Sequence, residues 1–232
     1  MNVRGVLPDR RRRVPAVLLA LLAVLVTTYV VAEHAIGGRP DRCERFTAAS
    51  ATRAGLVDGT GADVLVVGDS YAAGLLLENP HASWPSRLEG RVRVAGFSGS
   101  GFSRGASGCG DVSFATRTAQ ALGTDDDLVV VQGGLNDTDQ PPAAVRAGFE
   151  RLVRVVGERQ LVVVGPPSAP RRTGRVPAVQ AQLSALCASH GVPYVAADDL
   201  ELAYLDDGLH LTEAGHREFG NAVAQRIGAL QR

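Results

Sequence analysis

Short apolar runs alternate with longer, partly polar stretches over residues 62–232. Five runs rich in Val, Leu and Ala are typical of buried strands, and they lie at residues 62–67, 91–95, 127–131, 161–164 and 193–196. The stretches between and after them predict helices at residues 83–89, 112–122, 141–157, 176–190 and 212–230. Because strands that alternate with helices form a parallel sheet, we expect an α/β domain with helices on both faces of the sheet. Ligands of such domains bind beyond the C-terminal ends of the strands.

A long apolar segment follows a basic cluster near the N-terminus. Residues 10–13 are all Arg, and residues 14–32 contain no charged side chain. A helix of this length, at about 1.5 Å per residue, nearly spans a hydrocarbon core of about 30 Å, and the arginines should stay in the cytoplasm. We expect residues 1–13 to be a basic cytoplasmic N-terminus and residues 14–32 a single transmembrane helix with the domain outside. A cleaved secretory signal peptide is the second interpretation, and a buried helix of a soluble protein is the third.

Residues 33–61 lack a regular hydrophobic pattern. Gly37, Gly38 and Pro40 interrupt helices and strands, and glycine recurs further along the segment. We therefore expect a linker here, with a short helix near residues 43–53 as an option, and one domain at residues 62–232.

Three cysteines, Cys43, Cys109 and Cys187, lack the close spacing of a zinc or redox motif. In a domain outside the cytoplasm, one disulfide can form and one thiol is left over. Packing of a small apolar side chain is the alternative at each position. The spacing does not choose the pair.

Composition excludes several classes of function. The chain has 24 basic and 24 acidic residues, and every basic residue is Arg. Without Lys, neither a Schiff-base lysine nor a phosphate-loop lysine is available. Residues 46–232 carry an excess of acidic over basic side chains, which argues against a nucleic-acid partner because phosphates require a basic face.

Two motifs contain the groups of an activated serine. Gly68-Asp69-Ser70 follows the first predicted strand, and a Ser hydroxyl needs a His base and amide donors for the oxyanion. Asp207-Gly208-Leu209-His210 precedes the last predicted helix, and an acid three residues before a His can orient its ring. Each motif alone is also typical of a turn.

Two further motifs follow the second and third predicted strands. In Gly133-Gly134-Leu135-Asn136-Asp137, the Asn amide is a neutral donor suited to an oxyanion, although Asn-Asp alone favours a turn. Residues 96–102 are glycine-rich, but Gly99, Gly101 and Gly105 miss the dinucleotide spacing by one residue. This loop is instead a candidate for donating a backbone N–H to the oxyanion. All four motifs are predicted at one edge of one sheet.

Together these motifs resemble those of the SGNH hydrolases, also called the GDSL esterase/lipase family. The resemblance covers about residues 62–232, with Tyr71 where the family often has Leu. The matching blocks are Gly68-Asp69-Ser70, Gly99, Gly134-Leu135-Asn136-Asp137 and Asp207-Gly208-Leu209-His210. The resemblance implies a flavodoxin-like, three-layer α/β/α sandwich with a parallel sheet of about five strands.

The resemblance also implies a role for each site residue. Ser70 is the expected nucleophile, His210 the base, and Asp207 the residue that orients His210. The expected oxyanion hole consists of the Ser70 N–H, the Gly99 N–H and the Asn136 side chain. Gly101 is the alternative glycine donor, two residues along. Asp69 is expected to be structural.

The motifs predict a membrane-tethered or secreted serine hydrolase that cleaves carboxylic esters of acyl lipids or O-acetylated glycans through an acyl-enzyme on Ser70. The alternatives are an acyltransferase on the same site and a non-catalytic module that binds the cell envelope. We expect no cofactor and no metal ion. The expected partners are an ester substrate and, through the N-terminal helix, the membrane; the oligomeric state is left open.

Other polar residues have weaker claims to a function. Asp125-Asp126-Asp127 fits a solvated turn better than a cation site. Arg171, Arg172 and Arg175, in a loop at the predicted site edge, are candidates for contacting an anionic substrate, with a solvated loop as the default. Three residues are expected mainly to pack: His81, Trp84 and His216.

Overall fold

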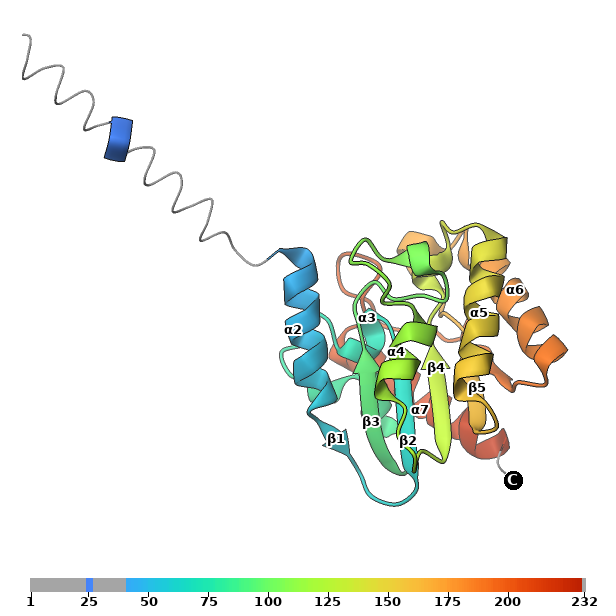
Figure 1. The fold of residues 1–232 in the computed structure, drawn as a ribbon. Helices are drawn as coiled ribbons and strands as arrows, with labels where there is room; N and C mark the ends of the chain where they lie inside the picture. Colours follow the sequence, from blue (N-terminus) through green and yellow to red (C-terminus); the bar gives the residue numbers. More distant parts are fainter. Residues whose placement is uncertain (1–23, 27–40, 231–232) are drawn as a thin grey trace, which may run out of the picture. The chain divides into compact units, whose positions relative to one another are not determined.

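The computed structural model describes residues 24–26 and 41–230. The chain divides into two compact units, Met1–Asp41 and Arg42–Arg232, and the second unit contains the fold shown in Figure 1. In the first unit, residues 24–26 are helical. The remaining residues of the predicted N-terminus, membrane segment and start of the linker lie outside the described ranges. Within those ranges, we find no helix whose length and apolarity would suffice for a membrane crossing.

The second unit is built on a mixed sheet of six strands in the order β1-β3-β2-β4-β5-β6. The strands are β1 Val57–Asp58, β2 Asp63–Gly68, β3 Arg91–Gly96, β4 Leu128–Gln132, β5 Gln160–Val164 and β6 Tyr194–Val195. The five predicted strands are present and mutually parallel. The expected all-parallel sheet of about five strands needs correction, because β1 adds an antiparallel edge strand beside β3. Two residues are too short to produce a hydrophobic pattern, which is why the sequence did not predict β1.

Strands β3, β2 and β4 end at the same level. Gly68 of β2 pairs with Gly96 of β3 on one side and with Gln132 of β4 on the other. The loops after these three strands therefore leave from one edge, as expected for a parallel sheet.

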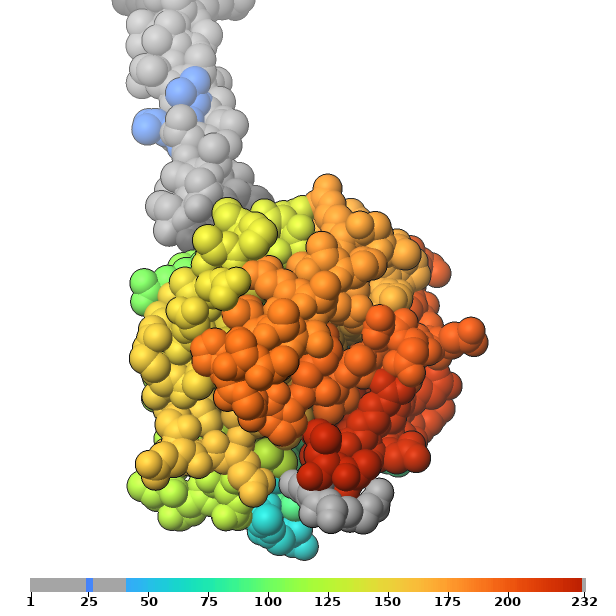
Figure 2. Space-filling model, turned by 90° about the vertical axis from the view of Figure 1, so that its right-hand side faces the viewer, coloured from blue at the N-terminus to red at the C-terminus, as the bar shows by residue number. Residues whose placement is uncertain are grey.

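Helices cover both faces of the sheet (Figure 1). They are α2 Arg42–Ala54, α3 Ser70–Ala73, α4 Phe114–Ala121, α5 Pro142–Val156, α6 Val176–His190 and α7 Glu213–Leu230. The predicted helix at residues 83–89 is instead the 3₁₀ helix Trp84–Arg87, with Pro85 at its start. The other predicted helices are confirmed to within two residues. Figure 2 shows α6 and α7 both at the surface on one side of the unit.

Alternate residues of β2 belong to two separate cores. Val64 and Val66 pack into the core that contains Phe219 of α7, whereas Leu65 and Val67 pack into the core with the side chains of α4, α5 and α6. This alternation follows from the opposite directions of successive side chains in a strand. It confirms the three-layer sandwich.

Residues 42–61 are part of the folded unit, whereas a linker was expected at residues 33–61. Helix α2 packs against β3, and a disulfide joins Cys43 to Cys109 and leaves Cys187 as the free, buried thiol. The fully buried Arg53 pairs with Asp58 of β1 at 2.9 Å. These contacts are long-range or depend on β1, so the glycine-rich composition of the segment did not reveal them.

Candidate active site

Ser70 is the first residue of the short helix α3, directly after strand β2 and the capping residue Asp69. Asp69 Oδ1 accepts the N–H of Tyr71 at 2.9 Å. The helix lies close to the sheet because Gly96 has no side chain: a Cβ there would lie 2.5 Å from the Ala73 nitrogen. The first N–H groups of a helix have no acceptor within the helix. The Ser70 N–H is therefore suited to the oxyanion role predicted for it.

Asp207 and His210 are in direct contact. His210 Nδ1 lies 2.5 Å from Asp207 Oδ2, and Asp207 Oδ1 accepts the backbone N–H groups of Leu209 and His210 at 2.9 Å each. Desolvation by burial acts to raise the pKa of Asp207, but these hydrogen bonds outweigh it and lower the pKa to about 2. The ionised carboxylate therefore holds the ring through Nδ1 and leaves Nε2 to act as a base.

Tyr71 connects the nucleophile segment to the histidine segment. Its hydroxyl donates a hydrogen bond to the carbonyl of Leu209. Because Tyr71 directly follows Ser70 and Leu209 directly precedes His210, this bond ties together the two parts of the chain that carry the predicted nucleophile and the predicted base. Burial raises the pKa of Tyr71, which keeps the hydroxyl protonated and able to donate. A Leu at this position, as the family often has, makes no such bond.

His216 lies behind this connection and serves packing, as expected. Its ring contacts the ring of Tyr71 edge-on, with 5.9 Å between the centroids, and the side chain is buried. Burial, with a smaller effect of His210, lowers the pKa of His216 to about 4. The imidazole is therefore neutral at neutral pH.

The Asn136 side chain contacts the glycine-rich loop after β3. Its Nδ2 donates to the Ser100 carbonyl at 2.8 Å, and the amide has a second N–H for a ligand. Gly99 is partly exposed with φ of 91°, whereas Gly101 is buried, and a Cβ on it would lie 2.6 Å from an Asp137 carboxylate oxygen. A donor to the oxyanion must face the substrate, so these environments favour Gly99 over Gly101.

Asp137 is a buried carboxylate beside the site for which the sequence predicted no role. Its Oδ2 accepts the N–H of Phe102 at 2.9 Å and its Oδ1 the N–H of Ser103 at 2.8 Å, so the carboxylate holds the loop that carries Gly99. The side chain is buried, and no ion pair to it occurs among residues 24–26 and 41–230. Burial raises the pKa of Asp137 to about 6. The signal that could have found it is its place directly after Asn136 in the G-x-N-D motif.

Asp69 is a second buried carboxylate at this edge. Its Oδ2 has no hydrogen-bond partner in the part of the chain that the structure describes, and the same holds for Ser98 Oγ and the side-chain amide of Gln132. Ser98 lies two residues after the end of β3, and Gln132 is the last residue of β4; these two strands flank β2. Burial, with a smaller contribution from the charge of Asp137, raises the pKa of Asp69 to about 7. Asp69 therefore exchanges a proton near neutral pH, one residue from Ser70.

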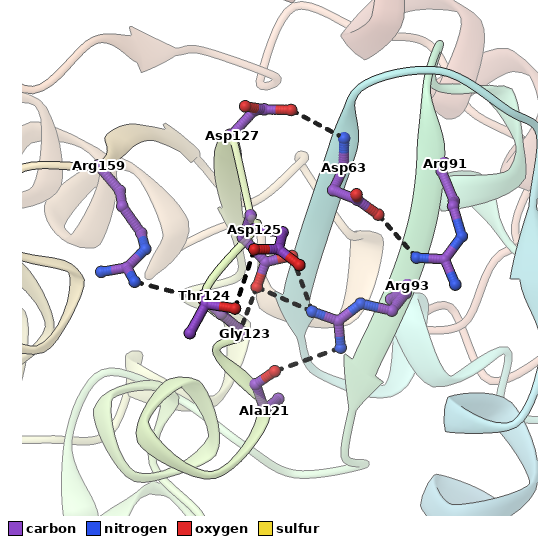
Figure 3. A network of polar contacts seen from close by, with 10 residues as sticks. Asp63, Arg91, Arg93, Ala121, Gly123, Thr124, Asp125, Asp127 and Arg159 are labelled. Carbon is purple, nitrogen blue, oxygen red and sulfur yellow. Dashed lines mark hydrogen bonds and ion pairs between the residues drawn. The ribbon is translucent and has the colours of Figure 1, made fainter.

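The acids before β4 lie at the N-terminal ends of the strands, away from the site. Figure 3 shows Asp127 beside Asp63, the first residue of β2. Arg93 Nη2 lies 2.7 and 2.8 Å from the two carboxylate oxygens of Asp126, and Asp127 accepts the N–H of Asp63 at 3.0 Å. Asp127 therefore joins the start of β4 to the neighbouring β2, and Asp126 joins β3 to the turn before β4. No group of three or more potential metal ligands occurs within the described ranges.

Two depressions border the loops of the site. One of about 370 Å³ is lined by Leu76, Tyr204, Leu205, Asp206, Asp207 and Thr212. The other, of about 390 Å³, is lined by Arg171, Arg172, Gly174 and Arg175. Larger hollows lie at the N-terminal ends of the strands, where Gln160 and Asp127 contribute to their walls. Size alone therefore does not identify the site, and we assign it from the contacts above.

The model of the GDSL-like lipase/acylhydrolase family matches residues 66–218, a range that includes all four motifs. The chain belongs to this family. Membership makes it a serine ester hydrolase, in agreement with the paired Asp207 and His210. No curated protein is similar enough to this hydrolase to count as a match.

Solved structures of other esterases share the fold of this GDSL hydrolase. A carbohydrate acetylesterase from Sinorhizobium meliloti is 21% identical with a TM-score of 0.61, and the match covers 73% of this chain and 100% of that one. The aryl esterase of M. smegmatis is 22% identical with a TM-score of 0.61 over the same shares. A family two carbohydrate esterase from Clostridium thermocellum is 14% identical with a TM-score of 0.57, over 74% of this chain and 64% of that one. At these identities the likeness shows the fold alone.

Proposed function

We propose that this GDSL hydrolase is an exported serine esterase that removes small acyl groups, with Ser70 as nucleophile, His210 as base and Asp207 as the residue that orients the base. The observation that carries the proposal is the hydrogen bond from Tyr71 to the Leu209 carbonyl. It joins the residue after Ser70 to the residue before His210, while Asp207 holds the His210 ring.

The reaction follows from these positions. Ser70 Oγ attacks the ester carbonyl as His210 Nε2 takes its proton, and the Ser70 N–H, the Gly99 N–H and the Asn136 amide stabilise the oxyanion. His210 then gives the proton to the leaving alcohol, and an acyl-enzyme remains on Ser70. Water, deprotonated by His210, attacks the acyl-enzyme and releases the carboxylic acid and free Ser70.

The proposed substrates are acetyl or other short acyl esters, with O-acetylated glycans preferred over acyl lipids. Two of the structural neighbours are named as carbohydrate esterases, which supports a carbohydrate ester. The depression beside Asp207, of about 370 Å³, has room for a short group.

We also propose that the catalytic domain works outside the cytoplasm, on a membrane anchor or after signal cleavage. The basic and apolar N-terminal pattern supports export. The Cys43–Cys109 disulfide supports it independently, because structural disulfides persist in oxidising compartments. A C-terminal reporter that is active only outside the cytoplasm tests export, and the intact mass of the recovered protein distinguishes an anchor from a cleaved signal.

The Ser70→Ala variant tests the reaction. We expect it to lose about 10³-fold or more of kcat on 4-nitrophenyl acetate, and the wild type to carry an acyl group on Ser70 in a quenched digest analysed by mass spectrometry. Ser189→Ala, at the far end of α6, is the matched control and should retain activity. Equal rates for wild type and Ser70→Ala would refute the proposal. Transfer of the acyl group to an added sugar would instead identify a transferase, and glycan binding without turnover would identify a binding module.

A further inference from the structure

The loop between β5 and α6 contacts the turn that carries the Asp207–His210 pair. The backbone N–H of Arg171 donates to the carbonyl of Gly208 at 2.9 Å. A Cβ on Gly208 would lie 4.0 Å from the Cβ of Arg171. The base of the Arg171 side chain is therefore packed against the turn that holds the catalytic His.

The same loop is braced on its other side to the segment that follows Asn136. Arg172 Nη1 lies 2.8 Å from Asp139 Oδ2 and 3.2 Å from Thr138 Oγ1, and Arg175 pairs with the other Asp139 oxygen. The loop thus bridges the oxyanion segment and the histidine segment. Its arginines border both parts of the site.

The arginines of this loop outnumber the carboxylates that pair with them. Arg172 and Arg175 share the single carboxylate of Asp139, whereas the exposed guanidinium of Arg171 makes no hydrogen bond or ion pair with any residue in the described ranges. The three arginines line the depression of about 390 Å³. The loop that they belong to lies at the surface (Figure 2). An exposed arginine without a protein partner, held beside a catalytic turn, is suited to binding an anionic group of a ligand.

We propose that Arg171 binds a carboxylate or phosphate on the alcohol portion of the ester, so that the enzyme prefers acyl esters of anionic alcohols such as acidic sugars. The inference rests on the proposed function. His210 must protonate the leaving alcohol oxygen, so the alcohol portion departs on the side of the histidine turn. Arg171 contacts that same turn through Gly208, which places the positive charge toward the alcohol rather than the acyl group.

A matched pair of substrates tests the inference. 4-Acetoxybenzoate carries a carboxylate on its alcohol portion, and methyl 4-acetoxybenzoate is the neutral counterpart. We expect the ratio of kcat/KM for the anionic over the neutral ester to fall about fivefold in Arg171→Gln, a size typical of a solvent-exposed charge contact. The ratio should be retained in Arg171→Lys to within about twofold, and should converge toward the Arg171→Gln value at high salt because salt screens exposed charges.

Arg154→Gln is the control, because Arg154 lies in the last turn of α5, at the end of the sheet away from the site. It should leave the ratio unchanged. Equal ratios in wild type and Arg171→Gln, with both esters hydrolysed, would overturn this inference and leave the proposed esterase intact. A selective loss on 4-nitrophenyl hydrogen succinate, whose charge is on the acyl side, would overturn the assignment to the alcohol portion. No turnover of either ester by the wild type would overturn the proposed function itself.

Discussion

Buried carboxylates occur at both ends of the strands of the central sheet, which we call its N-terminal and C-terminal edges, but their partners differ. At the N-terminal ends of the strands, Asp126 receives two contacts from the guanidinium of Arg93. At the C-terminal ends, Asp137 and Asp69 accept backbone N–H groups. Neither forms an ion pair within the described ranges, and the pKa of each is raised by burial.

This difference in partners corresponds to a difference in role, stability at the N-terminal edge and function at the C-terminal edge. A buried carboxylate that meets an Arg compensates its desolvation within the pair, and the Arg93–Asp126 pair joins β3 to the turn before β4. A buried carboxylate with backbone donors alone remains costly to ionise, but it fixes the loops that carry the oxyanion donors. We infer that the buried carboxylates at the C-terminal ends of the strands lower the stability of the fold but hold the loops of the site in place.

The largest expected effect comes from Asp207, which contacts the ring of His210. Asp207→Asn retains an oxygen for the backbone N–H groups but presents an amide N–H₂ to His210 Nδ1 and selects the wrong tautomer. We expect kcat for 4-nitrophenyl acetate to fall roughly 10³- to 10⁴-fold with little change in Tm. Asp206→Asn is the neighbouring control. A decrease below about tenfold would mean that Asp207 does not orient the base.

The next largest expected effect is on the free energy of unfolding and concerns the disulfide at the same end of the strands. The Cys43–Cys109 disulfide anchors the loop after β3 to α2 and has a sequence separation of 66. Replacing both cysteines by Ala should lower the free energy of unfolding by about 2–4 kcal/mol, measured by urea denaturation. Wild type under reducing conditions should behave like the double variant. Cys187→Ala controls for loss of a thiol, and identical urea midpoints for the double variant and wild type would show that the tie does not stabilise the unit.

Paired substitutions at the two edges test the comparison directly. Asp137→Asn should lower kcat/KM about 10- to 100-fold, because the amide has only one acceptor oxygen for the two N–H groups of the glycine loop. Asp126→Asn should instead lower the free energy of unfolding by about 1–3 kcal/mol and leave kcat/KM near the wild-type value. If both variants lost the same fraction of activity at matched stability, the two edges would not differ in the way we infer.

The last expected effect is gradual, a dependence of stability on pH that spreads over several pH units. The pKa of Asp69 is raised by burial to about 7, above an unfolded value of about 3.9. The native state therefore holds a proton that the unfolded state has lost, and the contribution to stability is present below about pH 4 and is lost as the pH rises to about 7. Asp69→Asn keeps the capping oxygen and should flatten this part of the curve, by at most about 1.4 kcal/mol per pH unit.

Urea denaturation of both proteins at several pH values between 4 and 8 measures this effect. Asp137 adds a similar slope up to about pH 6 in both proteins, so the difference between the two curves isolates Asp69. Parallel curves would show that Asp69 does not bind the extra proton in the native state.

Much of the fold could be predicted because its signals are local. Strands β2 to β5 are apolar runs, and the helices between them begin and end near residues that favour such ends, such as Pro142 at the start of α5. The errors occur where local signals are absent or conflicting. Strand β1 has only two residues, and α2 lies in a segment whose glycines suggested a linker.

The sequence by itself determined where the four motifs of this protein lie and at which ends of the strands they meet, because motif, strand and turn are encoded by neighbouring residues. The tertiary structure alone decided which cysteines pair, how Tyr71 ties Ser70's helix to the histidine turn across 138 residues, and which loops Asp137 and Arg171 contact. Those contacts depend on the path of the whole chain. Burial, which sets the pKa of Asp69 and Asp137, depends on every element packed around them, so no short stretch of sequence encodes it.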